Sequence, residues 1–277
     1  MDKRTEVYSL YGKPVSHSLS PLMFNRTFEK EGLNCKYISL EITNEQLRAA
    51  VEAARLLGFA GLNITSPHKV GIVSLLDKVS IEVEEIGSVN TVVRSAKGLE
   101  GYNTDGEGAV RALRVHGFEL RGSKVLVIGA GGAARSIVHS FSSEADEIII
   151  LNRTLERAQA VADKTKGIAK TSAGSLSRNE FEKNFRRAGL IVNATPIQTS
   201  RLVGTFGIFS TAPSHSPWIF DLSYDGEQKR NPPVRRIHPL ELLVQQAALS
   251  YELWFGHDAR IELMRSILIE HNRADWK

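Results

Sequence analysis

Segments with two different hydrophobic periods alternate along the first part of the chain. Residues 5–10 and 37–41 alternate apolar and polar side chains, as half-buried strands do, whereas apolar side chains recur every three or four positions over residues 47–58. Residues 58–65 then form another short apolar run. A strand, helix, strand order of this kind indicates a largely parallel sheet with helical connections.

The next forty residues predict a helical stretch, a hairpin and a second amphipathic helix. The helical stretch is expected after Pro67, and residues 89–94 and 98–104 have the pattern of two strands joined by a short turn. Asp105 is a good N-cap residue in front of an apolar-periodic segment. We therefore expect Asp105 to cap a helix over about residues 106–117.

A new pattern begins at Lys124. Residues 124–128 are an apolar strand, a glycine-rich turn follows at once, a helix is expected to about Ser143, and residues 146–151 form a second buried strand. These residues predict one βαβ unit. Further elements are expected as a helix at 154–165, strands at 189–193 and 217–222, and helices at 240–254 and 257–272. The overall class is α/β.

Length and composition limit the classes of protein to which this chain can belong. A chain of 277 residues predicts about two domains at roughly 150 residues each. Hydrophobic residues make up 42% and charged residues 24%, which fits a folded globular protein and excludes extended disorder. The net charge of +4 is too diffuse to indicate nucleic acid. The single cysteine, Cys35, and the lack of an apolar leader or span predict a cytoplasmic protein without a membrane partner.

The glycine-rich turn after residue 128 fits the dinucleotide motif G-x-G-x-x-A. Its members are Gly129, Ala130, Gly131, Gly132, Ala133 and Ala134. The first glycine permits a tight turn, the second lets the backbone approach a pyrophosphate, and the following helix N-terminus supplies N–H groups for the anion. Because the motif stands between a buried strand and a helix, we expect a bound dinucleotide rather than a ligand-free turn.

The end of the second strand of this βαβ unit indicates which dinucleotide is bound. An NAD enzyme usually has an acidic residue there, about 20 residues after the glycines, for the ribose 2′-hydroxyl. This chain has Asn152, Arg153 and Thr154, with Arg157 one turn later. Two guanidinium groups suit a 2′-phosphate, which favours NADP. The alternative is that both arginines are simply exposed at a helix start, where they oppose the helix dipole.

Two polar clusters in the first half of the chain could bind or transform a substrate. Ser16 and Ser18 lie two positions apart in an extended segment and could hold a carboxylate together, or Ser20 could cap a helix while they are solvated. Asn63 stands near a strand end, six positions before Lys69. A partly desolvated lysine can transfer a proton, although an exposed salt bridge is the commoner role of lysine.

Seven motifs occur in a fixed order along the chain. They are S-x-S-x-S-P from Ser16, N-x-T-x-P-x-K from Asn63, G-x-V-N-T from Gly87, Y-N-T-D-G from Tyr102, the glycine-rich turn, N-R-T from Asn152 and Q-A-A from Gln246. In these motifs the chain resembles the shikimate dehydrogenases from Ser16 to Gly256. The resemblance implies NADP-dependent, reversible reduction of 3-dehydroshikimate to shikimate, on the way to the aromatic amino acids. It also implies a substrate domain of residues 1–104, completed by helices of residues 239–277, and a Rossmann-type NADP domain of residues 105–238.

The resemblance assigns roles to individual residues. Lys69 and Asp105 would form the proton-transferring pair, and Ser16 and Ser18 would hold the substrate carboxylate. Independently of the resemblance, His68 is a competing acid, ranked second because in an extended stretch it would point away from the side of Lys69. The other substrate contacts would be Asn63, Thr65, Asn90, Asp105, Tyr224 and Gln246. The cofactor would contact Gly129, Ala130, Gly131, Gly132, Ala133, Asn152, Arg153, Thr154, Arg157, Thr195, Pro196 and Leu222. The other seven histidines show no metal-ligand spacing and no H-E-x-x-H motif occurs, so we expect no metal.

Three departures from the family pattern lie where the nicotinamide ring is expected. Gln198 and Thr199 follow N-A-T-P-I where the family has glycine and methionine, residues 225–230 replace a P-x-x-T sequence, and Pro239 stands where the family has glycine. Proline removes an N–H and fixes φ, so a backbone contact made there by glycine must change. A paralogue acting on quinate or another cyclic hydroxy acid, and a non-catalytic regulator that binds NADP, therefore stay as alternatives. The sequence does not decide whether the protein is a monomer or a homodimer.

Overall fold

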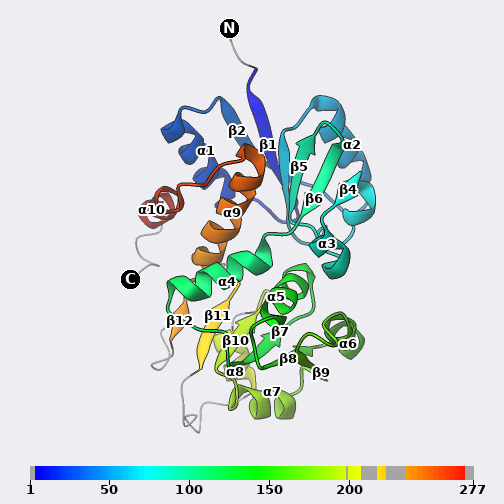
Figure 1. Ribbon diagram of the computed structural model, residues 1–277, viewed down its shortest axis with the longest axis vertical. Helices are drawn as coiled ribbons and strands as arrows, with labels where there is room; N and C mark the ends of the chain where they lie inside the picture. The colour runs from blue at the N-terminus through cyan, green and yellow to red at the C-terminus, as the bar shows by residue number, and fades with distance from the viewer. Residues whose placement is uncertain (1–3, 198, 207–216, 223–234, 272–277) are drawn as a thin grey trace. The chain divides into compact units, whose positions relative to one another are not determined.

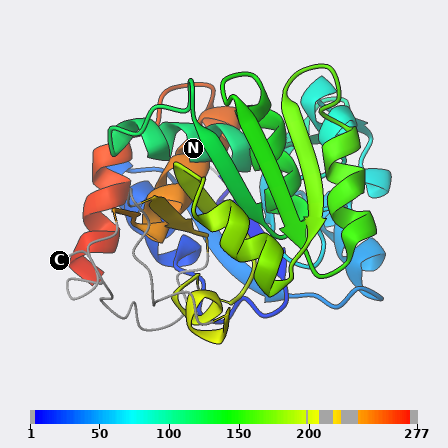
Figure 2. The same ribbon diagram turned by 90° about the horizontal axis from the view of Figure 1, so that it is seen from below.

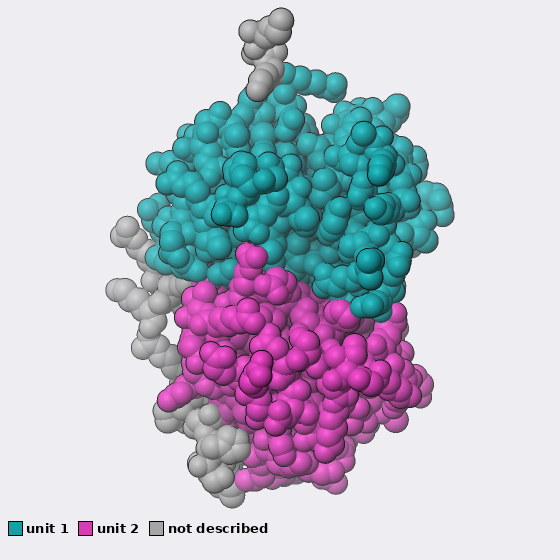
Figure 3. Space-filling model, viewed as in Figure 1, with its two compact units in different colours: residues 1–105, 243–277 teal, residues 106–242 magenta. Residues whose placement is uncertain are grey.

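The computed structural model describes residues 4–197, 199–206, 217–222 and 235–271. The chain forms two compact units, shown in different colours in Figure 3. Unit 1 consists of residues 1–105 and 243–277, and unit 2 of residues 106–242. Within the described residues, no helix combines the length and the apolar character needed to cross a membrane.

Unit 1 is built on one six-stranded mixed sheet with the order β2-β1-β3-β5-β6-β4. The strands are β1 (Glu6–Gly12), β2 (Cys35–Glu41), β3 (Gly61–Ile64), β4 (Lys78–Val79), β5 (Thr91–Ser95) and β6 (Gly98–Tyr102). The helices are α1 (Ser20–Glu31), α2 (Leu47–Leu57), the 3₁₀ turn η1 (Val73–Leu75), α3 (Ile81–Ile86), most of α9 (Pro239–Phe255) and α10 (Ile261–His271) (Figure 1). β1 pairs in parallel with β2 and β3, whereas β5 is antiparallel to β3 and β6.

Apolar side chains on the two faces of this sheet explain its layers. Leu47 and Val51 of α2 belong to a buried cluster with Leu62 of β3, on one face. On the other face, aromatic rings of β1 and α1 pack against Trp254 of α9. Gly61 makes this close approach possible, since an added Cβ would lie 2.3 Å from Trp254 Nε1. Trp254 Nε1 donates to Val92 O at 3.0 Å, which fixes the returning helix on the sheet.

Unit 2 is built on a six-stranded sheet in which every pair is parallel, with the order β12-β11-β10-β7-β8-β9. Its strands are β7 (Lys124–Ile128), β8 (Glu147–Asn152), β9 (Lys170–Ser175), β10 (Leu190–Asn193), β11 (Trp218–Asp221) and β12 (Arg236–Ile237). Its helices are α4 (Asp105–Val115), α5 (Gly132–Ser142), α6 (Leu155–Asp163), α7 (Arg178–Phe185) and α8 (Thr199–Phe206). β7, β8 and β9 lie side by side in green in Figure 2.

Two buried clusters cover opposite faces of the parallel sheet. One contains apolar residues of α4, α5 and α6, and the other contains Phe181 and Phe185 of α7 and Leu202 and Val203 of α8. Chain order reverses between β7 and β10, so the sheet is doubly wound. The expected α/β class with a Rossmann-type unit is confirmed.

Several local expectations differ from the structure. No long helix follows Pro67; the chain instead makes turns and the short η1 before β4. β9, α7 and α8 were not expected, because their short segments lack a clear apolar period. Asp105 does not cap α4 from outside but is its first residue, and its carboxylate binds other side chains. Pro239 is the first residue of α9, a position where a missing N–H costs little.

Candidate active site

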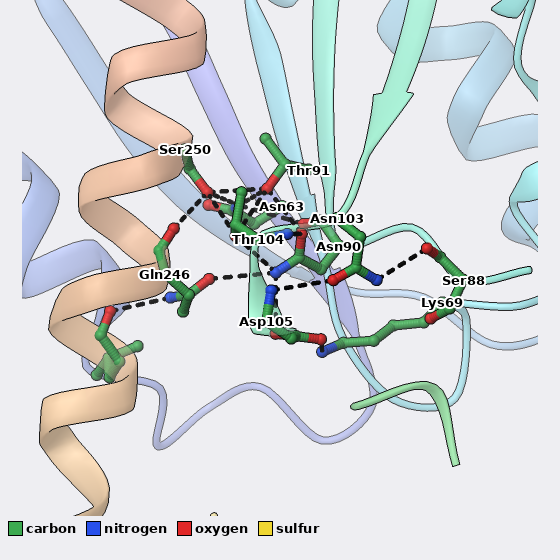
Figure 4. Close-up of polar contacts among 11 residues, drawn as sticks. Asn63, Lys69, Ser88, Asn90, Thr91, Asn103, Thr104, Asp105, Gln246 and Ser250 are labelled. Carbon is green, nitrogen blue, oxygen red and sulfur yellow. Dashed lines mark hydrogen bonds and ion pairs between the residues drawn. The ribbon is translucent and has the colours of Figure 1, made fainter. Parts of the chain in front are cut away.

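A lysine–aspartate pair lies at the edge of a polar cluster in unit 1 (Figure 4). Lys69 Nζ lies 2.5 Å from Asp105 Oδ2, and the two side chains are only 16% and 6% exposed. The backbone of Lys69 is fixed because its carbonyl accepts from Val89 N at 2.8 Å. The two residues that the sequence predicts as a proton-transferring pair are therefore in direct contact.

The start of α4 fixes the Asp105 carboxylate. Asp105 N donates to Asn103 Oδ1 at 2.9 Å, and Asp105 Oδ1 accepts from Asn90 Nδ2 at 2.9 Å. Each carboxylate oxygen thus has one partner, Asn90 on one side and Lys69 on the other. The next residue must be small, because a Cβ on Gly106 would lie 2.1 Å from Ser140 Oγ of α5.

Asn90 connects the pair to its surroundings. Its side-chain oxygen accepts from Thr104 N at 2.8 Å and from Thr91 Oγ1 at 2.9 Å. Besides Asp105, its amide nitrogen approaches Thr104 Oγ1 at 2.9 Å and Gln246 Oε1 at 3.4 Å. Gln246 comes from α9, so this late helix completes a cluster that begins on strands of the first half of the chain.

Asn63 is the centre of a second group of hydrogen bonds, next to Asn90. Its side-chain oxygen accepts from the Tyr37 hydroxyl at 2.8 Å, and its amide nitrogen lies 3.0 Å from Ser250 Oγ and 3.3 Å from Thr91 Oγ1. The amide nitrogen of Asn63 also donates to Asn90 O at 3.2 Å, and the residue is 6% exposed. Tyr37 and Ser250 gave no signal in the sequence beyond their strand and helix patterns, whereas Thr91 stands in the motif from Gly87.

The other residues predicted to bind substrate have local partners. Ser16 is exposed, with Oγ 3.1 Å from His17 Nδ1, and Ser18 Oγ accepts from Ser20 N at 3.3 Å. Ser20 does not cap α1 as the alternative interpretation had it, because Ser20 is the first residue of the helix and its N-cap is Leu19. Thr65 is half-buried. Among the described residues, no hydrogen bond joins these three side chains to Lys69 or Asp105. Tyr224 lies outside the described residues, as do Gln198 and residues 225–230.

His68 is engaged in packing. It is 1% exposed, and its Nε2 lies 2.7 Å from Ile42 O, so the ring connects the segment after β3 to the segment after β2. This agrees with the ranking of Lys69 above His68 as the proton donor. In the part of the chain that the structure describes, no three His, Cys, Asp or Glu side chains gather as a metal site would require.

The glycine-rich turn of unit 2 has the backbone that a dinucleotide needs. Gly129 follows β7 with φ +106°, a conformation that favours glycine. Gly131 is the N-cap of α5, has no neighbour within 4 Å of an added Cβ, and provides no side-chain cap for the first helical N–H groups. These N–H groups and the open space beside Gly131 fit a pyrophosphate.

The end of β8 fits a phosphorylated ribose. Arg153, Thr154 and Arg157 are exposed, and Asn152 Nδ2 donates to Thr154 O at 2.9 Å. Neither arginine has an ion-pair partner in the described ranges, so both guanidinium groups are available to an anion. Of the remaining predicted cofactor contacts, Thr195 Oγ1 lies 2.7 Å from Asn193 Oδ1, Pro196 is exposed, and Leu222 N donates to Asn193 O at 3.0 Å.

Three family models together match most of the chain. The model for the shikimate dehydrogenase substrate binding domain matches residues 10–92, and the model for shikimate / quinate 5-dehydrogenase matches residues 111–223. The model for the shikimate 5′-dehydrogenase C-terminal domain matches residues 240–269.

Individual proteins resemble the chain over nearly its whole length. A shikimate dehydrogenase (NADP(+)) of Methanopyrus kandleri is 40% identical, covering 99% of this chain and 98% of the relative. The structure of shikimate 5-dehydrogenase from Thermus thermophilus, in complex with NADP(H) and shikimate, is 31% identical with a TM-score of 0.79, covering 96% and 99% of the two chains. The structure from Listeria monocytogenes, in complex with shikimate and NAD, is 28% identical with a TM-score of 0.83, covering 97% and 99%.

Proposed function

The chain belongs to the shikimate dehydrogenase family, and from this membership and its site we propose that it catalyses the NADP-dependent, reversible reduction of 3-dehydroshikimate to shikimate. This reaction belongs to the route to the aromatic amino acids. The contact of 2.5 Å between Lys69 and Asp105 is the observation that carries the proposal, because it joins a proton donor to a group that can hold a substrate hydroxyl.

Proton transfer is the task of this chain's own residues. Bound NADPH supplies a hydride to the carbonyl carbon of the substrate. The oxygen then becomes an alkoxide, and the Lys69 ammonium donates a proton to it; in the oxidation of shikimate, the neutral amine of Lys69 accepts the hydroxyl proton. Asp105 orients Lys69 and accepts a hydrogen bond from a substrate hydroxyl, and Asn90 fixes the orientation of Asp105.

We assign substrate recognition to the residues that the sequence motifs predict. Ser16 and Ser18 hold the carboxylate, while Thr65, Gln246, Tyr224 and Asn90 bind ring hydroxyls. The hydrogen bonds of Asn63 to Tyr37, Ser250 and Asn90 favour a supporting role for that residue next to Asn90, in place of a direct substrate contact. A substrate hydroxyl near Asn90 would replace its long contact of 3.4 Å with Gln246.

The cofactor is held by unit 2. The pyrophosphate is bound by the turn from Gly129 to Ala133 and by the N-terminus of α5. The 2′-phosphate is bound by four residues at or just after the end of β8, namely Asn152, Arg153, Thr154 and Arg157. The two guanidinium groups that lack partners among the described residues support NADP over NAD, because a dianion would neutralise them. Thr195, Pro196 and Leu222 complete the contact on the side of β10 and β11.

A steady-state assay with shikimate or quinate, each combined with NADP or NAD, tests the proposal. The reaction is measured by the absorbance of the reduced nicotinamide. We expect the highest kcat/KM for shikimate with NADP. Oxidation of quinate in preference to shikimate would contradict the proposed substrate. Binding of NADP without turnover of either substrate would contradict an enzymatic function and favour a regulatory one.

We also propose that the protein works in the cytoplasm as a monomer or a homodimer. The buried, unpaired thiol of Cys35 supports a reducing compartment. Gel filtration with light scattering at assay concentrations measures the oligomeric state, and a trimer or larger assembly would contradict this part of the proposal.

A further inference from the structure

The loop after β10 in unit 2 is held together by one asparagine. Asn193 Oδ1 accepts from Thr195 N at 3.1 Å and from Thr195 Oγ1 at 2.7 Å. Asn193 Nδ2 donates to Ile197 O at 2.6 Å and to Asp221 Oδ1 at 2.8 Å. The loop from Asn193 to Ile197 therefore has a defined shape, although Pro196 and Ile197 are exposed.

Asp221, at the end of β11, connects this loop to the next helix and strand. Its Oδ1 accepts from Thr199 N at 2.9 Å and from Thr199 Oγ1 at 2.6 Å, at the first residue of α8. Its Oδ2 lies 3.4 Å from Arg236 Nη1, on β12. Asp221 is 7% exposed and Thr199 is fully buried, whereas the Arg236 side chain is 25% exposed, so the network of Asp221, Thr199 and Arg236 extends from the interior of the unit toward its surface.

The loop lies beside the dinucleotide turn. A Cβ on Gly129 would approach Ala194 O and Thr195 Cγ2 at 3.2 Å. The order of the sheet reverses between β7 and β10, and dinucleotides bind across the crevice at such a reversal. Because Arg153 at the end of β8 fits the phosphorylated adenosine half, the nicotinamide half must extend over the ends of β10 and β11, where Asn193 and Asp221 stand.

We propose that Asp221, Thr199 and Arg236 are positioning residues for the nicotinamide half of the bound cofactor. They hold the Asn193–Ile197 loop in the orientation that aligns the ring, and they do not touch the substrate. At position 199 the family pattern has methionine, whose thioether cannot donate a hydrogen bond to a carboxylate. In this chain the Thr199 hydroxyl fixes the helix start to Asp221 at the place where the usual ring pocket has changed.

The inference rests on the proposed function only for its catalytic readout. Thr199→Val removes the hydroxyl at nearly constant volume, whereas Thr199→Ser keeps the hydroxyl and loses only the methyl group. Ser200→Ala removes a neighbouring hydroxyl and is the matched control. We expect Thr199→Val to lower kcat about tenfold, since misplacement of a reacting group by about 1 Å can cost 10²-fold. The KM for shikimate and the Kd for NADPH should change less than about threefold, and the isotope effect on kcat with deuterated NADPH should rise.

Fluorescence of bound NADPH provides a readout that needs no turnover. The emission comes from the reduced nicotinamide ring, so a loosely held ring should lose emission enhancement in Thr199→Val at an unchanged Kd measured by calorimetry. Thr199→Ser and Ser200→Ala should keep the wild-type emission. Unchanged kcat and emission in Thr199→Val, or a lower melting temperature as the sole effect, would overturn the inference. A wild-type chain that fails to oxidise shikimate would contradict the proposed function, while the emission measurement would still decide the positioning role.

Discussion

The hydroxyl of Ser250 on α9 lies 3.0 Å from the side-chain nitrogen of Asn63 on β3, although 187 positions separate the two residues. Ser250 is fully buried and also lies 2.8 Å from Thr91 Oγ1. The same helix supplies Gln246 to Asn90, one turn earlier. Helix α9 therefore completes the polar interior next to the lysine–aspartate pair.

Ser250→Ala should destabilise the protein. The substitution removes the hydrogen bonds that Ser250 makes with Asn63 and Thr91, each worth about 0.5–1.5 kcal/mol net, while both residues keep other partners. Urea unfolding measures the change in unfolding free energy. Ser266→Ala is the control, because Ser266 on α10 bonds only to its own helix, at Leu263 O. Equal losses for the two variants would show that the contact with Asn63 contributes no stability.

Lys69→Ala should lower kcat by roughly 10²–10⁴ with a much smaller change in KM, because it removes the proton donor to the developing alkoxide. The contact between Lys69 and Asp105 motivates the prediction. Lys97→Ala, at an exposed position of the β5–β6 hairpin, is the control and should retain wild-type kinetics. Turnover near the wild-type value in Lys69→Ala would exclude Lys69 as the donor.

The sequence predicts the elements whose side chains are buried on both faces. Residues 125–128 are all apolar and buried, and the expected bounds 124–128 match β7. β9, with the sequence KTSAGS, is an edge strand with polar side chains, so no hydrophobic period identifies it. Propensity alone also suggested capping by Asp105, but the tertiary contacts with Lys69 and Asn90 determine the direction of its carboxylate.

In the candidate site, too, some residues could be predicted from the sequence and others could not. Lys69, Asn90 and Asp105 stand in recognisable motifs, and the structure brings them together. Tyr37 and Ser250 stand in no motif, since their contacts with Asn63 arise only when distant elements pack. A spacing rule along the chain cannot describe contacts of that kind.

Ser16→Ala and Ser18→Ala should each raise the KM for shikimate. A hydrogen bond from a hydroxyl to a charged group is worth about 1.5–3 kcal/mol, so the increase should be tenfold or more. Both variants should also discriminate less against an analogue without the carboxylate. Ser18 bonds to Ser20 N, so a capping role alone would lower the melting temperature of Ser18→Ala and leave KM unchanged. That result would remove the two serines from the substrate site.

Cys35 should react slowly with thiol reagents at mildly alkaline pH. Burial, assisted by the Glu6 carboxylate, raises the pKa of its thiol to about 11. The native state therefore keeps this proton at pH values where the unfolded chain has lost it, so the unfolding free energy should fall as pH rises from the ordinary thiol pKa toward 11. Comparing wild type with Cys35→Ala isolates this contribution, and the variant should show a smaller alkaline loss. Rapid labelling of the folded protein would contradict the prediction.

Arg153→Ala should weaken the binding of NADP far more than that of NAD, because only NADP carries the 2′-phosphate that the guanidinium would bind. In the described ranges, Arg153 has no carboxylate partner whose loss could account for a weaker affinity. Arg178→Ala, an exposed arginine of α7, controls for the general loss of one positive charge. Calorimetric titration with both dinucleotides separates the two effects. Equal losses for NADP and NAD in Arg153→Ala, matching those of Arg178→Ala, would mean that Arg153 acts only through the overall field and that another group recognises the phosphate.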